Sequence, residues 1–165
     1  MRIAVLTISD RSARGEREDA GGPAVADAAR RLLPAAEVVV ASVVPDDARA
    51  IGAEIARLAD GGVADLILTT GGTGLSPRDV TPQATKSVLD YEVPGLAEAM
   101  RAATRAAVPT AVLSRQVAGV RRRTLVVNLP GSPKGAVECL GAVASVLPHA
   151  VATLRGEAGD AHPRL

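Results

Sequence analysis

An apolar run passes directly into a glycine-rich turn in the stretch Leu66-Ile67-Leu68-Thr69-Thr70-Gly71-Gly72-Thr73-Gly74. The run has the length and composition of a β-strand that is buried on both faces. Apolar runs at residues 3–8, 38–44 and 124–128 alternate with segments in which apolar residues repeat at helical spacing. Strands that alternate with helices predict βαβ units, so we expect an α/β fold with a mostly parallel sheet and helices on both faces.

The other expected elements are helices that start near residues 23, 48, 81, 94 and 133, a last short helix at 149–154, and a strand at 108–113. Thr81 is expected to cap its helix, because Pro82 suits the first helical position. Residues 9–22 are rich in charge and are expected to form a solvated loop. We expect one domain over residues 1–154 and a C-terminal tail over residues 155–165, since a chain of 165 residues has the length of one domain.

Composition argues against several classes of protein. Lys and Arg number 19 and Asp and Glu number 18, and this balance is unlike a protein that binds nucleic acid through bulk charge. Tyr91 is the only aromatic residue, so stacking platforms for single-stranded nucleic acid or a flavin are hard to build. The single Cys139 forms no intrachain disulfide, which favours the cytoplasm. No apolar stretch approaches the ~20 residues of a membrane span, and no signal peptide is evident, so we expect no membrane partner.

In a parallel α/β sheet, ligands bind beyond the carboxyl ends of the strands. The turn after residues 66–68 lies at such an end, and glycine lets backbone N–H groups approach an oxyanion closely. Threonine adds hydroxyl donors, but the turn is neither a dinucleotide fingerprint nor a Walker loop. The alternative is an ordinary tight turn between a strand and a helix. The candidate phosphate-binding residues are Thr70, Gly71, Gly72, Thr73 and Gly74.

Acidic residues are expected at the same sheet edge. Asp46 and Asp47 follow the strand at 38–44; one of them is sufficient to cap the next helix, and the other is a candidate ligand. Asp79 follows the glycine-rich turn, where it is a candidate ligand; the alternatives are that it only supports a helix start or pairs with Arg78. Carboxylates would repel a phosphate, and a divalent cation such as Mg²⁺ resolves this conflict by binding both kinds of oxygen. The residues alone thus point to nucleotide-phosphate chemistry assisted by Mg²⁺.

Two further loops supply polar candidates. Ser114 and Arg115 follow the strand expected at 108–113, and Ser132 and Lys134 follow the strand at 124–128. Near a helix N-terminus, Ser132 or Lys134 could hold a second anionic group; the alternative is an ordinary loop with a solvated lysine. The run at residues 121–123 is read as a solvated arginine hairpin, and Cys139 as a core residue.

Several motifs together resemble the molybdenum-cofactor biosynthesis family, which includes molybdopterin adenylyltransferases and the G domain of gephyrin. They are Thr70-Gly71-Gly72-Thr73-Gly74, Arg78-Asp79-Val80-Thr81-Pro82, Pro94-Gly95, Leu113-Ser114-Arg115 and Asn128-Leu129-Pro130-Gly131-Ser132-Pro133. The resemblance runs from about Ile3 to about Leu154. It implies a three-layer α/β/α sandwich, a homo-oligomer that is usually a trimer and sometimes a hexamer, and transfer of AMP from Mg·ATP to the terminal phosphate of molybdopterin.

The resemblance also assigns roles to single residues. It implies that Asp46 and Asp79 are the catalytic, Mg²⁺-binding acids, and that Ser114 and the loop Pro130-Gly131-Ser132 line the substrate pocket. A departure is Gly21-Gly22-Pro23, where family members often have Ser-Gly-Pro. A phosphate monoester is mostly dianionic near pH 7, so such a transfer needs no general base.

Three other functions are compatible with this fold class. The first is a non-catalytic molybdopterin-binding or oligomeric scaffold member of the same family. The second is an enzyme of the same fold that inserts molybdate, although such proteins usually carry extra domains. The third is a flavodoxin-like electron carrier.

Overall fold

The structure is a computed structural model that describes residues 1–157 of the chain. It contains one six-stranded sheet in the order β2-β1-β3-β6-β5-β4. Its strands are β1 (Arg2–Ile8), β2 (Glu37–Val44), β3 (Leu66–Thr70), β4 (Tyr91–Glu92), β5 (Ala118–Arg121) and β6 (Thr124–Leu129). The strands β2, β1, β3 and β6 run parallel, whereas β5 is antiparallel to both of its neighbours. The predicted mostly parallel sheet is confirmed.

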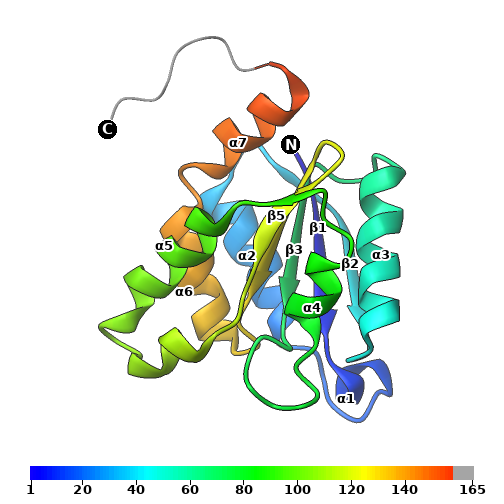
Figure 1. The fold of residues 1–165 in the computed structure, drawn as a ribbon, viewed down its shortest axis with the longest axis vertical. Helices are drawn as coiled ribbons and strands as arrows, with labels where there is room; N and C mark the ends of the chain where they lie inside the picture. The colour runs from blue at the N-terminus through cyan, green and yellow to red at the C-terminus, as the bar shows by residue number, and fades with distance from the viewer. Residues whose placement is uncertain (158–165) are drawn as a thin grey trace.

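Helices cover both faces of the sheet (Figure 1). One layer contains α2 (Gly21–Leu32), α5 (Pro94–Arg105), α6 (Pro133–Val143) and α7 (Leu147–Arg155). The other contains α3 (Ala48–Asp60) and the short α4 (Thr81–Lys86), and a single turn, α1 (Asp10–Ala13), lies at the carboxyl end of β1. This is the expected three-layer α/β/α sandwich. Helix α7 includes Arg155, one residue beyond the predicted domain end, and residues 158–165 of the predicted tail lie outside the described residues.

The core has two parts because successive side chains of a strand point to opposite faces. On β1, Ile3 and Val5 are buried in the layer that contains α2 and α6, while Ala4 and Leu6 are buried in the layer that contains α3. All five residues of β3 are buried. This explains why the strands appear in the sequence as continuous apolar runs rather than as alternating patterns.

The strand predicted at 108–113 is wrong. Residues Pro109–Leu113 form a 3₁₀ helix, η1, in which no residue is buried. Pro109 has no backbone N–H to donate to a sheet, and the segment lies at the surface beyond α5. The position in the sheet is taken by β5, which follows η1 and forms a hairpin with β6. The arginine turn of this hairpin lies at the end of the sheet opposite to α1 (Figure 1).

The two connections that start from β1 and from β2 lie on opposite faces of the sheet, and the strand order reverses between β1 and β3. From β1 the chain passes through α2 to β2 on one side, and from β2 it passes through α3 to β3 on the other side. Such a switch point opens a crevice at the carboxyl ends of the strands. The segments after β1, β2, β3 and β6 therefore meet at one edge, the lower end of the molecule in Figure 1.

Within residues 1–157, no single helix is long and apolar enough to cross a bilayer. Helices α6 and α7 together have the length and apolar composition of a membrane span, but they are bent by 63° relative to each other.

Candidate active site

The glycine-rich loop turns sharply because two of its residues adopt backbone angles that favour glycine. Gly71 has φ 109° and Gly72 has φ 64°. A Cβ atom on Gly71 would lie 2.3 Å from the carbonyl oxygen of Ile8, so the loop passes directly against the end of β1. A side chain at positive φ is strained, and a side chain on residue 71 would also collide with Ile8. This backbone conformation therefore requires glycine at position 71.

Hydrogen bonds hold this loop against its neighbours. The hydroxyl of Thr70 donates to the carbonyl oxygen of Pro130 at 2.7 Å, which ties the loop to the segment after β6. The hydroxyl of Thr81 donates to the carbonyl oxygen of Gly71 at 2.9 Å. The expectation that Thr81 caps α4 is therefore wrong: Val80 occupies the cap position, and the buried Thr81 hydroxyl serves the glycine loop instead.

The loop leaves its own amides available. Within residues 1–157, the backbone N–H groups of Gly72, Thr73 and Gly74 donate no hydrogen bond to another protein group. Consecutive unpaired N–H groups around a residue in the left-handed region form a concavity that binds anions. The loop thus has the properties expected of a phosphate cradle.

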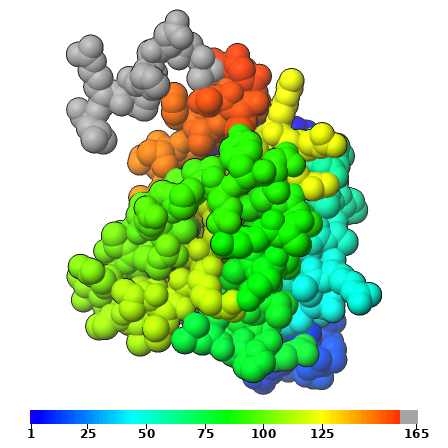
Figure 2. Space-filling model, viewed as in Figure 1, coloured from blue at the N-terminus to red at the C-terminus, as the bar shows by residue number. Residues whose placement is uncertain are grey.

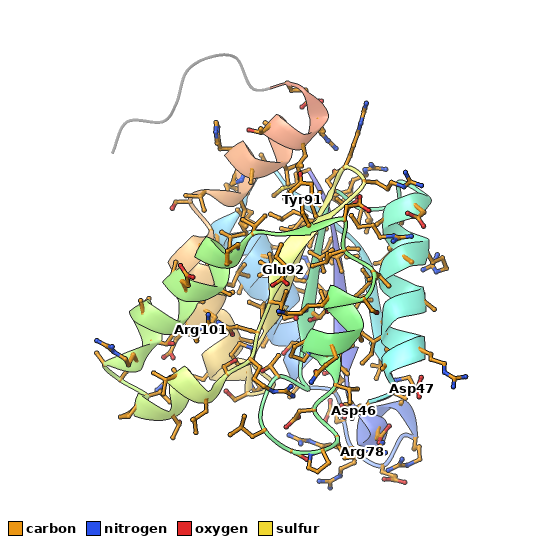
Figure 3. The ribbon with its side chains drawn as sticks, in the orientation of Figure 1. Asp46, Asp47, Arg78, Tyr91, Glu92 and Arg101 are labelled. Carbon is orange, nitrogen blue, oxygen red and sulfur yellow. The ribbon has the colours of Figure 1, made fainter. Side chains whose placement is uncertain are left out.

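The structure separates the roles of the two adjacent aspartates. Asp47 caps α3: its carboxylate accepts a hydrogen bond from the backbone N–H of Ala50 at 2.9 Å. Asp46 turns toward the glycine loop, and its Oδ1 atom would lie 3.4 Å from a Cβ on Gly72. The spare carboxylate that the sequence analysis anticipated is therefore Asp46 (Figure 3).

Asp79 approaches the same loop from its other end. A Cβ atom on Gly74 would lie 2.9 Å from the Oδ2 atom of Asp79, so only glycine fits comfortably beside this carboxylate. The Oδ2 atom accepts a hydrogen bond from the backbone N–H of Ser76 at 2.8 Å. Asp46 and Asp79 thus lie beside the same glycine loop, Asp46 near Gly72 and Asp79 near Gly74.

The two carboxylates influence each other. Burial raises the pKa of Asp46 above its ordinary range, and the negative charge of Asp79 raises it further. Two like charges at one edge favour a cation between them, and Mg²⁺ is commonly held by one or two carboxylates together with substrate phosphates. Among the described residues, no cluster of three or more His, Cys, Asp or Glu side chains could hold a metal. Asp46 and Asp79 can supply two ligands to Mg²⁺, and water or a substrate phosphate would complete its shell.

Asp10 is a site residue that the sequence analysis missed. Its backbone N–H donates to the Oδ2 atom of Asp46 at 2.7 Å, and its Oδ1 atom accepts from the N–H of Asp46 at 3.0 Å. Its Oδ2 atom pairs with Arg78. The interpretation of residues 9–22 as a solvated loop concealed Asp10, but the rule applied to Asp46 would have found it, since Asp10 also follows a strand.

Next to the glycine loop lies a cavity of about 490 Å³, a size suited to a small-molecule ligand. Its other walls come from α5, η1 and the start of α6. Of these, α5 and η1 form the left part of the face seen in Figure 2. Six of the predicted substrate-binding residues line it: Thr73, Gly74, Ser114, Pro130, Ser132 and Lys134.

The polar residues of this cavity differ in how much of their hydrogen bonding is already used. Ser132 caps α6 by accepting from the N–H of Gly135 at 3.2 Å, and the amino group of Lys134 lies 3.9 Å from Glu138. The hydroxyl of Ser114 donates only long contacts, to Thr73 at 3.5 Å and to the side chain of Gln116 at 3.3 Å. Ser114 and Lys134 therefore have the most capacity to bind a ligand.

The remaining predicted residues, which include Gly131 and Arg115, do not line the cavity. Gly131 packs on the glycine loop, since a Cβ at this position would lie 3.2 Å from the Cα atom of Gly71. Arg115 directs its guanidinium group at the backbone of the loop that carries Asp79. Arg101, on α5, was not predicted; it lines the cavity and donates to the carbonyl oxygens of Ser114 and Gln116, each at 3.3 Å. Cys139 is buried in the core, as expected, and also contributes to the cavity wall.

Comparisons with known proteins agree with this geometry. A family model described as "probable molybdopterin binding domain" matches residues 4–149. The molybdopterin adenylyltransferase of Helicobacter pylori strain J99 is 40% identical over 156 residues, which cover 94% of this chain and 89% of that protein. The Escherichia coli K12 enzyme of the same name is 42% identical over 143 residues, 87% of this chain and 73% of that protein.

A solved structure gives the same result. The molybdopterin biosynthesis enzyme MoaB from Thermus thermophilus superposes with a TM-score of 0.85 at 52% identity, covering 94% of this chain and 96% of that one. The resemblance drawn from the glycine loop and the Arg78-Asp79-Val80-Thr81-Pro82 motif is thus confirmed by matches over most of the chain. The chain belongs to the molybdopterin-binding domain family of molybdenum-cofactor biosynthesis proteins.

Proposed function

We propose that this protein is a molybdopterin adenylyltransferase, which transfers AMP from Mg·ATP to the terminal phosphate of molybdopterin and releases pyrophosphate. The observation that carries the proposal is the glycine loop, whose free amides at Gly72, Thr73 and Gly74 lie between two carboxylates and a cavity of about 490 Å³. The relatives that bear this name support the same reaction.

The reaction joins two anions, so its main requirements are placement and cancellation of charge. An oxygen of the terminal phosphate attacks the α-phosphorus of ATP, a new P–O bond forms, and the bond to the β-phosphate oxygen breaks. The phosphate needs no base, because its second pKa is near 6 and it is mostly dianionic at pH 7. The amides of the glycine loop would hold this nucleophile, while Ser114 and Lys134 bind the rest of the substrate in the cavity.

Asp46 and Asp79 are the residues that would hold Mg²⁺. When bound, Mg²⁺ supplies charge neutralisation between the triphosphate and the phosphate nucleophile. Each carboxylate has one oxygen that makes no hydrogen bond within the described residues, Oδ1 in both cases. These two oxygens are therefore available as ligands without breaking the contacts that hold the side chains.

The central test is Asp79→Asn. We expect AMP transfer to fall by about three orders of magnitude, as when several kcal/mol of charge stabilisation is lost. Molybdopterin binding, measured by fluorescence titration, should change little because the amides and the cavity stay intact. Glu54→Gln on α3 is the matched control, since Glu54 pairs with Arg57 and takes no part in the site. Wild-type turnover in Asp79→Asn would contradict the proposal.

Two measurements on the wild-type protein, pyrophosphate release and molybdopterin binding, distinguish the enzyme from a non-catalytic binding or scaffold member of the family. Pyrophosphate release that depends on both ATP and molybdopterin supports the enzyme. Tight molybdopterin binding by the wild-type protein without pyrophosphate release would favour the scaffold.

The assembly and the compartment are part of the proposal. The family resemblance supports a homo-oligomer, with a trimer favoured over a hexamer, and light scattering of the purified protein distinguishes the two masses. The buried position of the single Cys139 is compatible with the proposed cytoplasmic location.

A further inference from the structure

One arginine fastens both ends of the loop at residues 74–79, which carries Asp79. The backbone N–H of Arg115 donates to the carbonyl oxygen of Thr73 at 2.9 Å. Its Nε atom donates to the carbonyl oxygen of Gly74 at 2.7 Å, and its Nη2 atom donates to the carbonyl oxygen of Asp79. The planar guanidinium group thus bridges the start and the end of the loop, a geometry that a lysine ammonium cannot reproduce.

Inside the loop, Asp79 depends on this closure for its orientation. Its backbone N–H donates to the carbonyl oxygen of Ser76 at 2.9 Å, and its Oδ2 atom accepts from the N–H of Ser76 at 2.8 Å. These contacts fix the Asp79 side chain relative to the loop, and Arg115 fixes the loop relative to the sheet edge. Without Arg115, the loop would lose its position, and its internal hydrogen bonds would open more often.

The second carboxylate is held through the same loop. Asp10 exchanges two hydrogen bonds with Asp46, at 2.7 and 3.0 Å, and pairs with Arg78 through its remaining carboxylate oxygen. Arg78 directly precedes Asp79, so a chain of contacts runs from Asp46 through Asp10 and Arg78 to the loop that carries Asp79. Figure 3 shows Asp46 and Arg78 together at this end of the molecule.

We propose that Arg115 and Asp10 are positioning residues that fix the distance between Asp79 and Asp46, the two acids of the proposed adenylyl transfer. Neither residue needs to touch the reacting phosphates. The two carboxylates repel each other, and without these attachments the loop at residues 74–79 can move away from Asp46. Since a misplacement of about 1 Å can cost a factor of about 100 in rate, such a frame is required by a reaction that depends on placement. The inference rests on the proposed function.

The experiment compares Arg115→Lys and Asp10→Asn with the wild-type protein. We expect kcat for AMP transfer to fall at least about tenfold in each variant, with KM for molybdopterin within about twofold of the wild-type value. Binding of Mn²⁺ alone, followed by electron paramagnetic resonance, should weaken by about tenfold. Amide hydrogen exchange at Ser76 should become faster in Arg115→Lys, because its bond to Asp79 depends on a fixed loop.

The matched control is Arg57→Lys. Arg57 also makes a two-point contact, with Glu54 at 2.7 and 2.8 Å, but it lies on the exposed side of α3. All four measurements should stay at their wild-type values in this variant. If Asp10→Asn fails to fold, Arg78→Ala removes the same link from an exposed position, since the Arg78 side chain is 67% exposed.

The outcomes separate the two proposals. If kcat and Mn²⁺ affinity in Arg115→Lys both stay within about twofold of the wild type, the positioning role is overturned. If KM for molybdopterin rises while kcat is unchanged, Arg115 binds substrate and the positioning role is again overturned. If the wild-type protein transfers no AMP, the proposed function fails, but Mn²⁺ affinity and amide exchange still test whether Arg115 and Asp10 hold the two acids in place.

Discussion

Two adjacent aspartates show how finely the fold distinguishes residues of the same type. Asp47 has its carboxylate committed to the N-terminus of α3, where it stabilises the helix. Asp46 lies one residue earlier, points to the other side and faces Asp79, so its ionised form is disfavoured by burial and by charge. The ionised Asp46 carboxylate therefore lowers the stability of the folded protein, as is common for residues of a functional site.

This arrangement predicts that Asp46→Asn abolishes AMP transfer but makes the free protein more stable at pH 7, by about 0.5 kcal/mol. The amide oxygen can still accept from the N–H of Asp10, whereas the disfavoured charge is gone. A raised pKa in the folded state means that wild-type stability is lost as pH rises through that pKa, so the gain should vanish below about pH 4. Chemical denaturation at both pH values measures it. Equal destabilisation at pH 4 and pH 7 would contradict the pKa argument.

At the scale of elements, the important feature is the close contact of the glycine loop with the end of β1. Gly71 meets the carbonyl oxygen of Ile8, and Gly131 from the next loop packs on Gly71 in turn. The backbones of three segments therefore lie in direct contact at this point. This contact holds the glycine loop beside the ends of β1 and β6, close to Asp46 and Asp79.

Gly71→Ala should therefore lower the free energy of unfolding by about 3 kcal/mol, because the new Cβ is strained by φ and collides with the backbone of β1. Gly141→Ala on α6 is the opposite case, since no atom lies within 4 Å of its added Cβ. There the substitution should stabilise by about 0.8 kcal/mol through helix propensity. Urea denaturation of both variants tests the pair, and a neutral Gly71→Ala would show that the loop can move away from β1.

At the scale of the whole molecule, Asp65 joins β1 to α7, the first and last described elements, at the amino edge of the sheet. It accepts a hydrogen bond from the backbone N–H of Arg2 at 2.6 Å and forms ion pairs with Arg2 at 2.9 Å and Arg155 at 2.5 Å. Burial alone would raise the pKa of Asp65, but the hydrogen bonds from the two arginines outweigh burial and hold the pKa well below its ordinary range. This carboxylate fastens β1 and α7 to the start of β3.

We expect Asp65→Asn to destabilise the protein by about 2 kcal/mol at pH 7, the range for hydrogen bonds to a charged group. A depressed folded pKa gives stability above the unfolded pKa, near 3.9, that is lost as pH falls toward the folded pKa. The difference between variant and wild type should therefore shrink below about pH 4. Asp27→Asn, in an exposed pair with Arg30, is the control and should change little. A difference that is the same at pH 3 and pH 7 would contradict this account.

Local pattern was sufficient for much of the fold and for the composition of the site. The apolar runs of β1, β2, β3 and β6 predicted strands because buried parallel strands need apolar side chains on both faces. The glycine loop and the nearby aspartates could be selected because chemistry at a sheet edge needs particular residue types there. The segment at 108–113 failed because apolar composition alone does not separate a strand from a surface turn that begins at a proline.

The sequence by itself determined the fold class, the four parallel strands and which loops form the candidate site, because burial and backbone freedom leave a local signature in residue type. Only the tertiary structure decided which of Asp46 and Asp47 faces the site, that Thr81 serves the glycine loop, and that Asp10 and Arg115 hold the two acids in place. These assignments depend on contacts between segments far apart in the chain, such as Asp10 with Asp46. No local pattern encodes such a contact, since it exists only when strand order and crossover direction bring the segments together.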